Sequence, residues 1–302
     1  MAITAAMVKE LRERTGAGMM ECKKALTESK GDMETAIETL RRKGAASAEK
    51  KAGRITAEGI IARYSSGDGK QEVLVEVNCE TDFVAKDDSF VAFASKTAEC
   101  IANNHPADVA ALMDTAIDDS GQSVETARQA LITKIGENIS VRRFEDWSAN
   151  ADSRLNTYLH GARIGVLVET SGGRDDLGRD LAMHVAASSP MCVDESGIDP
   201  ELLEKEKQIF AAQARESGKP EDIIEKMVTG RIKKFTKENT LLGQHYVKDQ
   251  DQSVAKLLES EKASVARFLR MEVGEGIEKR EEDFASEVAA QLKDQKEKGN
   301  KE

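Results

Sequence analysis

The segment EVLVEVNCETDFVAKDDS, residues 72–89, decides the fold. Its first part, residues 72–77, is rich in β-branched residues, which pack well on a pleated surface, and it predicts a buried or half-buried strand. Its last residues, Asp87-Asp88-Ser89, open a helix. The run Thr81-Asp82-Phe83-Val84 therefore lies on a short turn at the carboxyl end of the strand. Loops held between rigid elements are where binding residues concentrate.

This turn has two readings. Phe83 places a large apolar ring beside the acceptor Asp82, and such a ring could dock in a pocket of a partner protein. Alternatively, Phe83 covers the protein's own core and Asp82 caps the following helix. From spacing alone, the second reading is the commoner one.

Outward from this turn, the neighbouring patterns predict a mixed unit of strands and helices. Gly59–Tyr64 reads as a strand that forms a β-hairpin with residues 72–77 through a turn at 65–69. Helical patterns follow over Ser89–Asn103 and through 124–135, and Ile139–Phe144 alternates as a further strand. These elements predict one α+β half, residues 55–149.

The second half, residues 150–275, repeats this order of elements. Val166-Leu167-Val168-Glu169 matches Val73-Leu74-Val75-Glu76 residue for residue. A late strand over 266–271 resembles residues 141–144 of the first half in character. The repeat predicts a duplicated α+β core with antiparallel sheets. No counterpart of Thr81-Asp82-Phe83-Val84 follows the second strand, so the halves share a fold without sharing that turn.

Helical segments surround the core. Residues 1–44 read as three short helices, the first capped by Thr4, and the basic run 41–54 reads as a solvated linker, in part helical. Pro200–Ser217 and Glu221–Phe235 predict an antiparallel coiled-coil hairpin, inserted at about 190–237. Its expected inward residues are Leu202, Leu203, Ile209, Phe210, Ile223, Ile224, Met227, Val228 and Ile232. A last helix over 278–296 forms a carboxyl-terminal module, 276–302.

Composition excludes several function classes. The net charge of −11 argues against duplex nucleic-acid binding, which needs a basic surface to neutralise phosphates. No apolar run reaches the length of a membrane span, and Met1–Thr4 lacks the start of a secretory signal, so a cytoplasmic protein is expected. The four cysteines form no Cys-x-x-Cys pair and are expected to be free thiols rather than metal ligands.

The sequence offers little enzyme chemistry. Residues 173–180 have the glycine spacing of a phosphate loop but lack the Lys and Ser/Thr that a working loop carries. The four histidines show no metal-binding spacing, and His184 reads as a packing residue. No catalytic residue, metal or cofactor is therefore expected.

Two further stretches carry a family resemblance. Residues 8–12 (VKELR) and 15–26 (TGAGMMECKKAL), together with residues 76–86, resemble signatures of the elongation factor Ts family, the guanine-nucleotide exchange factors of elongation factor Tu. Glu21 stands where the family often has Asp, which keeps the charge. Family-like stretches continue as far as Lys279, so the resemblance covers nearly the whole chain.

The resemblance implies a fold and a mechanism. Residues 1–54 would hold a ubiquitin-associated-like three-helix module with its linker, and the hairpin would be the family's coiled-coil protrusion. Thr81, Asp82, Phe83 and Val84 would bind elongation factor Tu in its GDP form and disturb its Mg²⁺ and phosphate site, so that GDP leaves and GTP enters. The Mg²⁺ would belong to the partner, and no nucleic acid or membrane would be bound.

Two alternatives stay open. One is an RNA-binding translation factor that uses the coiled coil and the basic linker; the acidic charge and an aromatic content of only 4% count against it. The other is an enzyme with an unrecognised phosphoryl-transfer site, which the incomplete phosphate loop disfavours.

Overall fold

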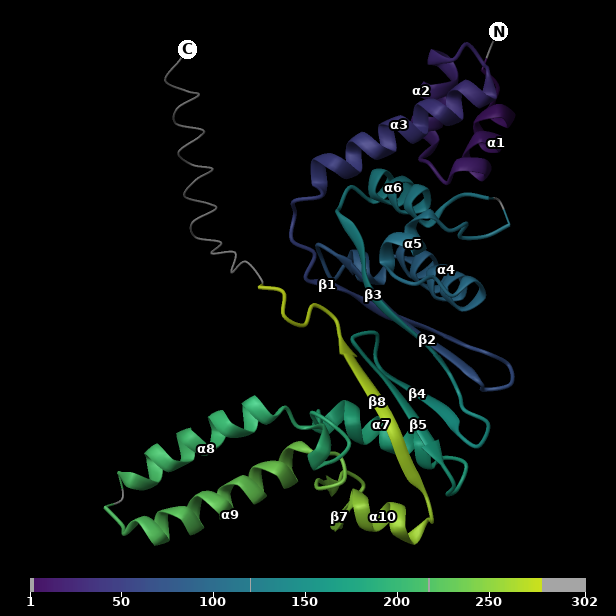
Figure 1. Cartoon of the computed structure of the whole chain (residues 1–302). Helices are drawn as coiled ribbons and strands as arrows, with labels where there is room; N and C mark the ends of the chain where they lie inside the picture. Colours follow the sequence, from purple (N-terminus) through teal and green to yellow (C-terminus); the bar gives the residue numbers. More distant parts are fainter. Residues whose placement is uncertain (1–2, 120, 217, 279–302) are drawn as a thin grey trace, which may run out of the picture.

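The computed structural model describes residues 3–119, 121–216 and 218–278, and Figure 1 shows how the elements are arranged. The helices are α1 (Ala5–Thr15), α2 (Met19–Glu28), α3 (Met33–Lys51), α4 (Asp88–Asn104), α5 (Val109–Asp114), α6 (Val124–Ile135), α7 (Leu177–Ser188), α8 (Pro200–Arg215), α9 (Glu221–Asn239) and α10 (Val254–Ser260). The strands are β1 (Glu58–Ser65), β2 (Gln71–Cys79), β3 (Ile139–Ser148), β4 (Arg154–His160), β5 (Ile164–Ser171), β6 (His245–Tyr246), β7 (Asp249–Ser253) and β8 (Ser264–Glu272). The expected α+β class is confirmed. The last helix, expected over 278–296, lies outside the described part apart from Glu278.

Helices α1 to α3 form a small unit with its own core of Val8, Leu11, Ala17, Cys22, Ala25, Leu26, Ala36 and Leu40. The hydroxyl of Thr4 accepts a hydrogen bond from the Met7 amide at 3.3 Å, so Thr4 caps α1 as the sequence predicts. Gly16 ends the same helix at φ 66°, a left-handed conformation that favours glycine.

The basic run 41–54, expected to be a solvated linker that is helical in part, is helical as far as Lys51 and packs on the first half of the core. Helix α3 continues to Lys51, and its small residues Gly44 and Ala48 are buried. A Cβ at Gly44 would lie 3.6 Å from Gln129 of α6, so the missing side chain lets the two helices approach closely. The alanine and lysine residues of this run favour helix, and tertiary packing on α6 stabilises it.

Two three-stranded antiparallel sheets form the core, in the orders β1-β2-β3 and β4-β5-β8. The repeated sequence lies on the central strand of each sheet. Glu76 pairs in register with Arg143 of β3, and Glu169 pairs with Arg267 of β8. The register shifts directly after the glutamate in both sheets, so the duplication extends to the same irregularity.

The repeat also explains the layers. Val73 and Val75 pack in a core with helices α4 to α6, and the equivalent valines of β5 pack against α7 and α10. Leu74 points to the opposite face, where it meets Leu167 in a cluster between the two sheets. Because side chains alternate along a strand, each sheet has a helix-covered face and a face turned to the other sheet (Figure 1).

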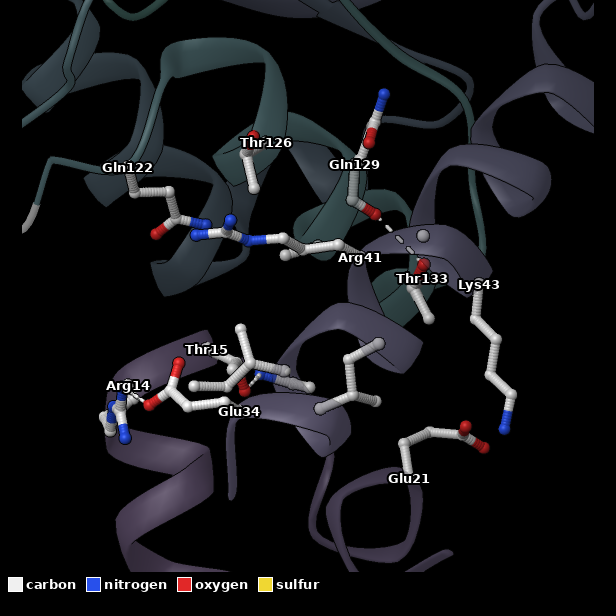
Figure 2. A pocket seen from close by; sticks show the side chains of 15 residues that line it. Arg14, Thr15, Glu21, Glu34, Arg41, Lys43, Gln122, Thr126, Gln129 and Thr133 are labelled. Atoms are coloured by element: carbon white, nitrogen blue, oxygen red, sulfur yellow. Dashed lines mark hydrogen bonds and ion pairs between the residues drawn. The ribbon is translucent and has the colours of Figure 1, made fainter. Parts of the chain in front are cut away.

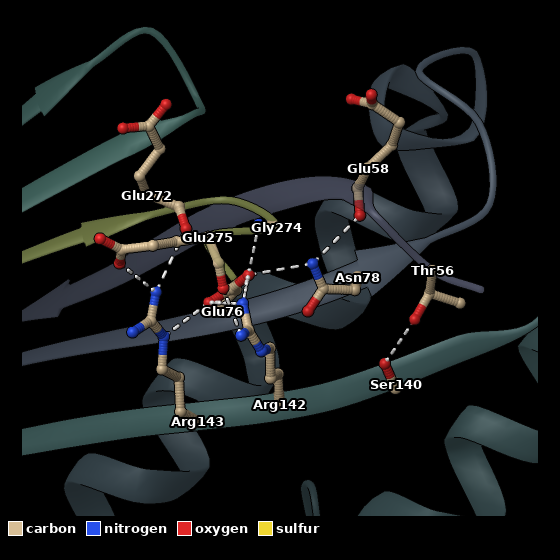
Figure 3. Close-up of polar contacts among 10 residues, drawn as sticks. All are labelled: Thr56, Glu58, Glu76, Asn78, Ser140, Arg142, Arg143, Glu272, Gly274 and Glu275. Carbon is tan, nitrogen blue, oxygen red and sulfur yellow. Dashed lines mark hydrogen bonds and ion pairs between the residues drawn. The ribbon is translucent and has the colours of Figure 1, made fainter. Parts of the chain in front are cut away.

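A buried carboxylate lies at the same sheet-to-sheet face. The Glu76 side chain is fully buried, and it accepts hydrogen bonds from Arg143 Nε at 2.7 Å and from Arg142 Nη1 at 3.1 Å. Asn78 Nδ2 and the Gly274 amide complete the site at 3.0 and 2.8 Å. Gly274 follows β8 of the second half, so this carboxylate joins the two halves (Figure 3).

Helices α8 and α9 project from the second half as a hairpin (Figure 1). The inward direction expected for Ile209 and Ile223 is wrong, because they are 48% and 37% exposed. In the described helices α8 and α9, the buried residues are Ala214 and Ile224. Two helices that pack only on each other bury one narrow stripe, and apolar residues beside that stripe stay in contact with water.

Candidate functional site

The turn after β2 presents Phe83 to solvent. Its side chain is 81% exposed, whereas Val84, the next residue, is 8% exposed and packs in the core of the first half. The reading in which Phe83 covers the protein's own core is therefore wrong. Val84 instead anchors the turn, and its side chain is not available to a partner in this conformation.

Asp82 lies beside Phe83 and is also exposed. Its Oδ2 accepts a hydrogen bond from Lys86 Nζ at 2.8 Å, and this bond holds the pKa of Asp82 below its ordinary value. The expectation that Asp82 caps the next helix is wrong, because Asp87 accepts the hydrogen bonds from Ser89 N and Phe90 N at the start of α4. Phe83 therefore stands next to an exposed carboxylate that remains ionised near neutral pH.

Cys79 is the last residue of β2, directly before this turn. Burial, with the charges of Glu137 and Glu58, raises the pKa of its thiol to about 12. The thiol stays protonated near neutral pH and points at the Thr81 carbonyl oxygen, 3.1 Å away. Since nucleophilic cysteines react as thiolates, this geometry suits a packing role.

A second exposed apolar surface lies on the amino-terminal unit. Met19 and Met20 begin α2 and are 60% and 73% exposed. The sequence pattern predicts no role for either methionine. Met20 lies two positions before the inward Cys22 and so about 200° around the helix from it. This spacing is the sequence signal that places Met20 on the outer face of α2.

A cavity lies between the amino-terminal unit and α6, beside the contact of α3 with α6 (Figure 2). It has a volume of about 260 Å³ and is lined by residues of α1, α2, α3 and α6 and the loop before α6. Arg14 and Glu34 form an ion pair at 2.7 Å in its wall. Neither histidine nor cysteine is among its lining residues.

The buried histidine His184 has a packing role, as the sequence suggests. Its Nδ1 accepts a hydrogen bond from the Val247 amide at 3.1 Å, and its Nε2 lies 2.9 Å from Gln244 Oε1. These partners fix the neutral tautomer with hydrogen on Nε2, and burial lowers the pKa.

Within residues 3–119, 121–216 and 218–278, no group of three or more His, Cys, Asp or Glu side chains is arranged to hold a metal ion. In the same part of the chain, none of the helices combines the length and apolar character needed to cross a bilayer.

Comparison with known proteins identifies the family. The family described as Elongation factor TS matches residues 80–275. Elongation factor Ts of Thioalkalivibrio sulfidiphilus is 61% identical over 293 residues, which cover 97% of this chain and 99% of that protein. The proteins of the same name from Alkalilimnicola ehrlichii and Methylococcus capsulatus are each 58% identical, with the same coverage. The chain belongs to the elongation factor Ts family of translation elongation factors.

Proposed function

We propose that this protein binds elongation factor Tu in its GDP-bound form and speeds the release of GDP, so that GTP takes its place. Membership in a family of exchange factors without catalytic chemistry of their own supports this function. A cytoplasmic location follows from a role in translation. The observation that carries the proposal is the 81% exposure of Phe83 on a turn whose next residue is buried.

In the proposed mechanism, Thr81, Asp82, Phe83 and Val84 form a wedge segment. The Phe83 ring enters the partner near its Mg²⁺ and phosphate site and displaces the elements that hold the ion. The exposed Asp82 carboxylate contributes a polar contact beside the ring, while the buried Val84 holds the segment to this protein's core. Loss of the Mg²⁺ contacts weakens the hold on GDP, and the nucleotide leaves.

The energetics require more than one contact surface. A nucleotide bound with nanomolar affinity corresponds to about 12 kcal/mol. Burying one phenylalanine contributes only about 1.5–3 kcal/mol. The exchange factor must bind the nucleotide-free partner more tightly than the GDP form, and by reciprocity GDP weakens its binding by the same factor.

We assign part of the remaining binding energy to the amino-terminal unit. The exposed Met19 and Met20 give it an apolar surface, and methionine side chains adapt readily to a partner. The proposed role of this unit is to dock on the nucleotide-binding domain of elongation factor Tu. Binding and nucleotide release would then depend on different residues.

The decisive experiment is stopped-flow release of labelled GDP from purified elongation factor Tu, with and without this protein. Strong acceleration that is largely lost in Phe83→Ala supports both the function and the wedge. Asp82→Ala tests the polar contact in parallel. Absence of acceleration at every concentration rejects the exchange function. A Phe83→Ala variant that fails to bind, but leaves the release rate per complex unchanged, rejects the wedge.

A further inference from the structure

The geometry points to Glu137 as a positioning residue for Phe83. This inference rests on the proposed function, because it concerns how the wedge segment is held. Glu137 lies in the short connection between α6 and β3, far from Phe83 in the sequence. It does not belong to the wedge segment itself.

One carboxylate satisfies three donors at the end of β2. Glu137 Oε2 accepts hydrogen bonds from the Glu80 amide at 3.1 Å and from the Thr81 amide at 3.0 Å. Glu137 Oε1 accepts a hydrogen bond from the Thr81 hydroxyl at 2.7 Å. Hydrogen bonds to an ionised acceptor are stronger than neutral ones, so this contact fixes the backbone where the wedge segment begins.

A second carboxylate, that of Glu80, binds the segment that carries Glu137. Glu80 Oε1 accepts a hydrogen bond from the Asn138 amide at 2.6 Å. Glu80 and Glu137 therefore bind each other's segments reciprocally. Asn138 Nδ2 in turn donates to the Arg54 carbonyl oxygen at 3.0 Å, which ties the same connection to the chain that follows α3.

The wedge segment is consequently fixed on both sides of Phe83. Thr81 is held by Glu137 on one side, and Val84 is buried on the other. The Phe83 ring is 81% exposed and has little packing of its own to define its direction. Its direction therefore depends on the backbone, and a loop fixed in its bound conformation loses less entropy when a partner binds.

Removing the carboxylate should affect nucleotide release more than binding. Glu137→Ala leaves three donors without their acceptor and lets the wedge segment sample other conformations. We expect the maximal rate of GDP release to fall about tenfold. The free energy of hydrogen bonds to a charged acceptor corresponds to at least this factor. The concentration for half-maximal release should change less than about twofold, because the other contact surfaces are unaltered.

The test is a double-mutant cycle in the stopped-flow assay with full-length protein. If Glu137 acts through Phe83, Glu137→Ala has no further effect in the Phe83→Ala background. Glu137→Gln keeps an oxygen acceptor and should give an intermediate rate. Asp146→Ala is the matched control. The Asp146 carboxylate is likewise a hydrogen-bond acceptor, with Gln71 and His105 as its two partners. It lies near the other end of β3, roughly 23 Å from the end at which Glu137 lies.

Two results overturn the inference: a maximal rate equal to wild type in Glu137→Ala, or effects of Glu137→Ala and Phe83→Ala that multiply. Amide hydrogen exchange over residues 79–86 gives an independent measurement, and it should be faster in Glu137→Ala and unchanged in Asp146→Ala. If the wild-type protein does not accelerate GDP release, the proposed function fails. Amide hydrogen exchange then still tests whether Glu137 holds the wedge segment in place. Exchange that is unchanged in Glu137→Ala would overturn this positioning role as well.

Discussion

Glu76 and Glu169 occupy the same place in the two halves of the core. Arg143 Nε donates to Glu76 Oε2 at 2.7 Å, and Arg267 Nε donates to Glu169 Oε2 at the same distance. Both carboxylates are almost completely buried on the face between the sheets. The remaining partners differ: Glu76 binds the Gly274 amide from the other half, whereas Glu169 accepts from the nearby Asn150. Among the described residues, the Glu76 carboxylate accepts a hydrogen bond from the other half, whereas the partners of the Glu169 carboxylate all lie in its own half.

Removing the Glu76 carboxylate should destabilise the protein. Glu76→Ala leaves Arg142 and Arg143 without their buried partner, and we expect the free energy of unfolding to fall by about 3 kcal/mol. Chemical denaturation measures this. Glu275→Ala is the control, because Glu275 contacts the same Arg143 at 3.1 Å but its side chain is 53% exposed. An exposed pair contributes less than about 1 kcal/mol. Equal losses in the two variants would contradict the assignment.

The Glu76 site also predicts a pH dependence. Burial alone would raise the pKa of Glu76, but hydrogen bonds from Gly274, Asn78 and Arg143 outweigh it and hold the pKa below the ordinary 4.5. The unfolded state therefore binds the proton first as the pH falls. The stabilisation is complete above pH 4.5 and is lost as the pH falls through the folded-state pKa. The stability difference between wild type and Glu76→Gln should shrink below pH 4.5, and a constant difference would refute this.

His184 predicts a second pH dependence, in a different range. Its burial lowers the pKa from the ordinary 6.5, so in the unfolded state it is protonated at a higher pH than in the folded state. Wild-type stability should therefore decrease as the pH falls below 6.5. In His184→Gln this component of the pH dependence should disappear. Thermal unfolding between pH 8 and 5.5 measures it, and equal slopes for the two proteins would count against it.

Phe83 should matter for nucleotide release and not for folding. Because the ring is 81% exposed, we expect Phe83→Ala to change the free energy of unfolding by less than about 0.5 kcal/mol. Phe90 is the matched control: it is fully buried, and Phe90→Ala should cost about 3–5 kcal/mol. Denaturation and GDP release are measured on both variants. A large loss of stability in Phe83→Ala would mean that the ring supports the fold.

The exposed methionines should affect binding rather than the maximal rate. If Met19 and Met20 dock on elongation factor Tu, the double Met19→Ala, Met20→Ala variant should raise the concentration for half-maximal GDP release by about tenfold or more. The maximal rate should stay close to wild type, unlike that of Glu137→Ala. A lower maximal rate with unchanged half-saturation would show that this surface acts on release itself.

Several elements could be predicted from local sequence. Thr4 caps α1, the segment before Thr81 forms a strand, and Val73-Leu74-Val75-Glu76 reappears on the central strand of the second sheet. These features depend on spacing along the chain, because side-chain alternation in strands and hydrogen bonding at helix starts are local properties. Other elements could not be predicted. They are α5, α10 and the short strands β6 and β7, which contain too few residues to show a clear hydrophobic periodicity.

The sequence by itself determined the duplicated α+β class and the turn that carries Thr81-Asp82-Phe83-Val84. Only the tertiary structure decided which of these side chains face water: Phe83 is exposed and Val84 is buried, although both are apolar neighbours. It also decided that residues 41–51 continue α3, because α6 packs on Gly44. Burial depends on which surfaces the folded chain brings together across long sequence separations, and the contact between Glu137 and Thr81 exists for the same reason.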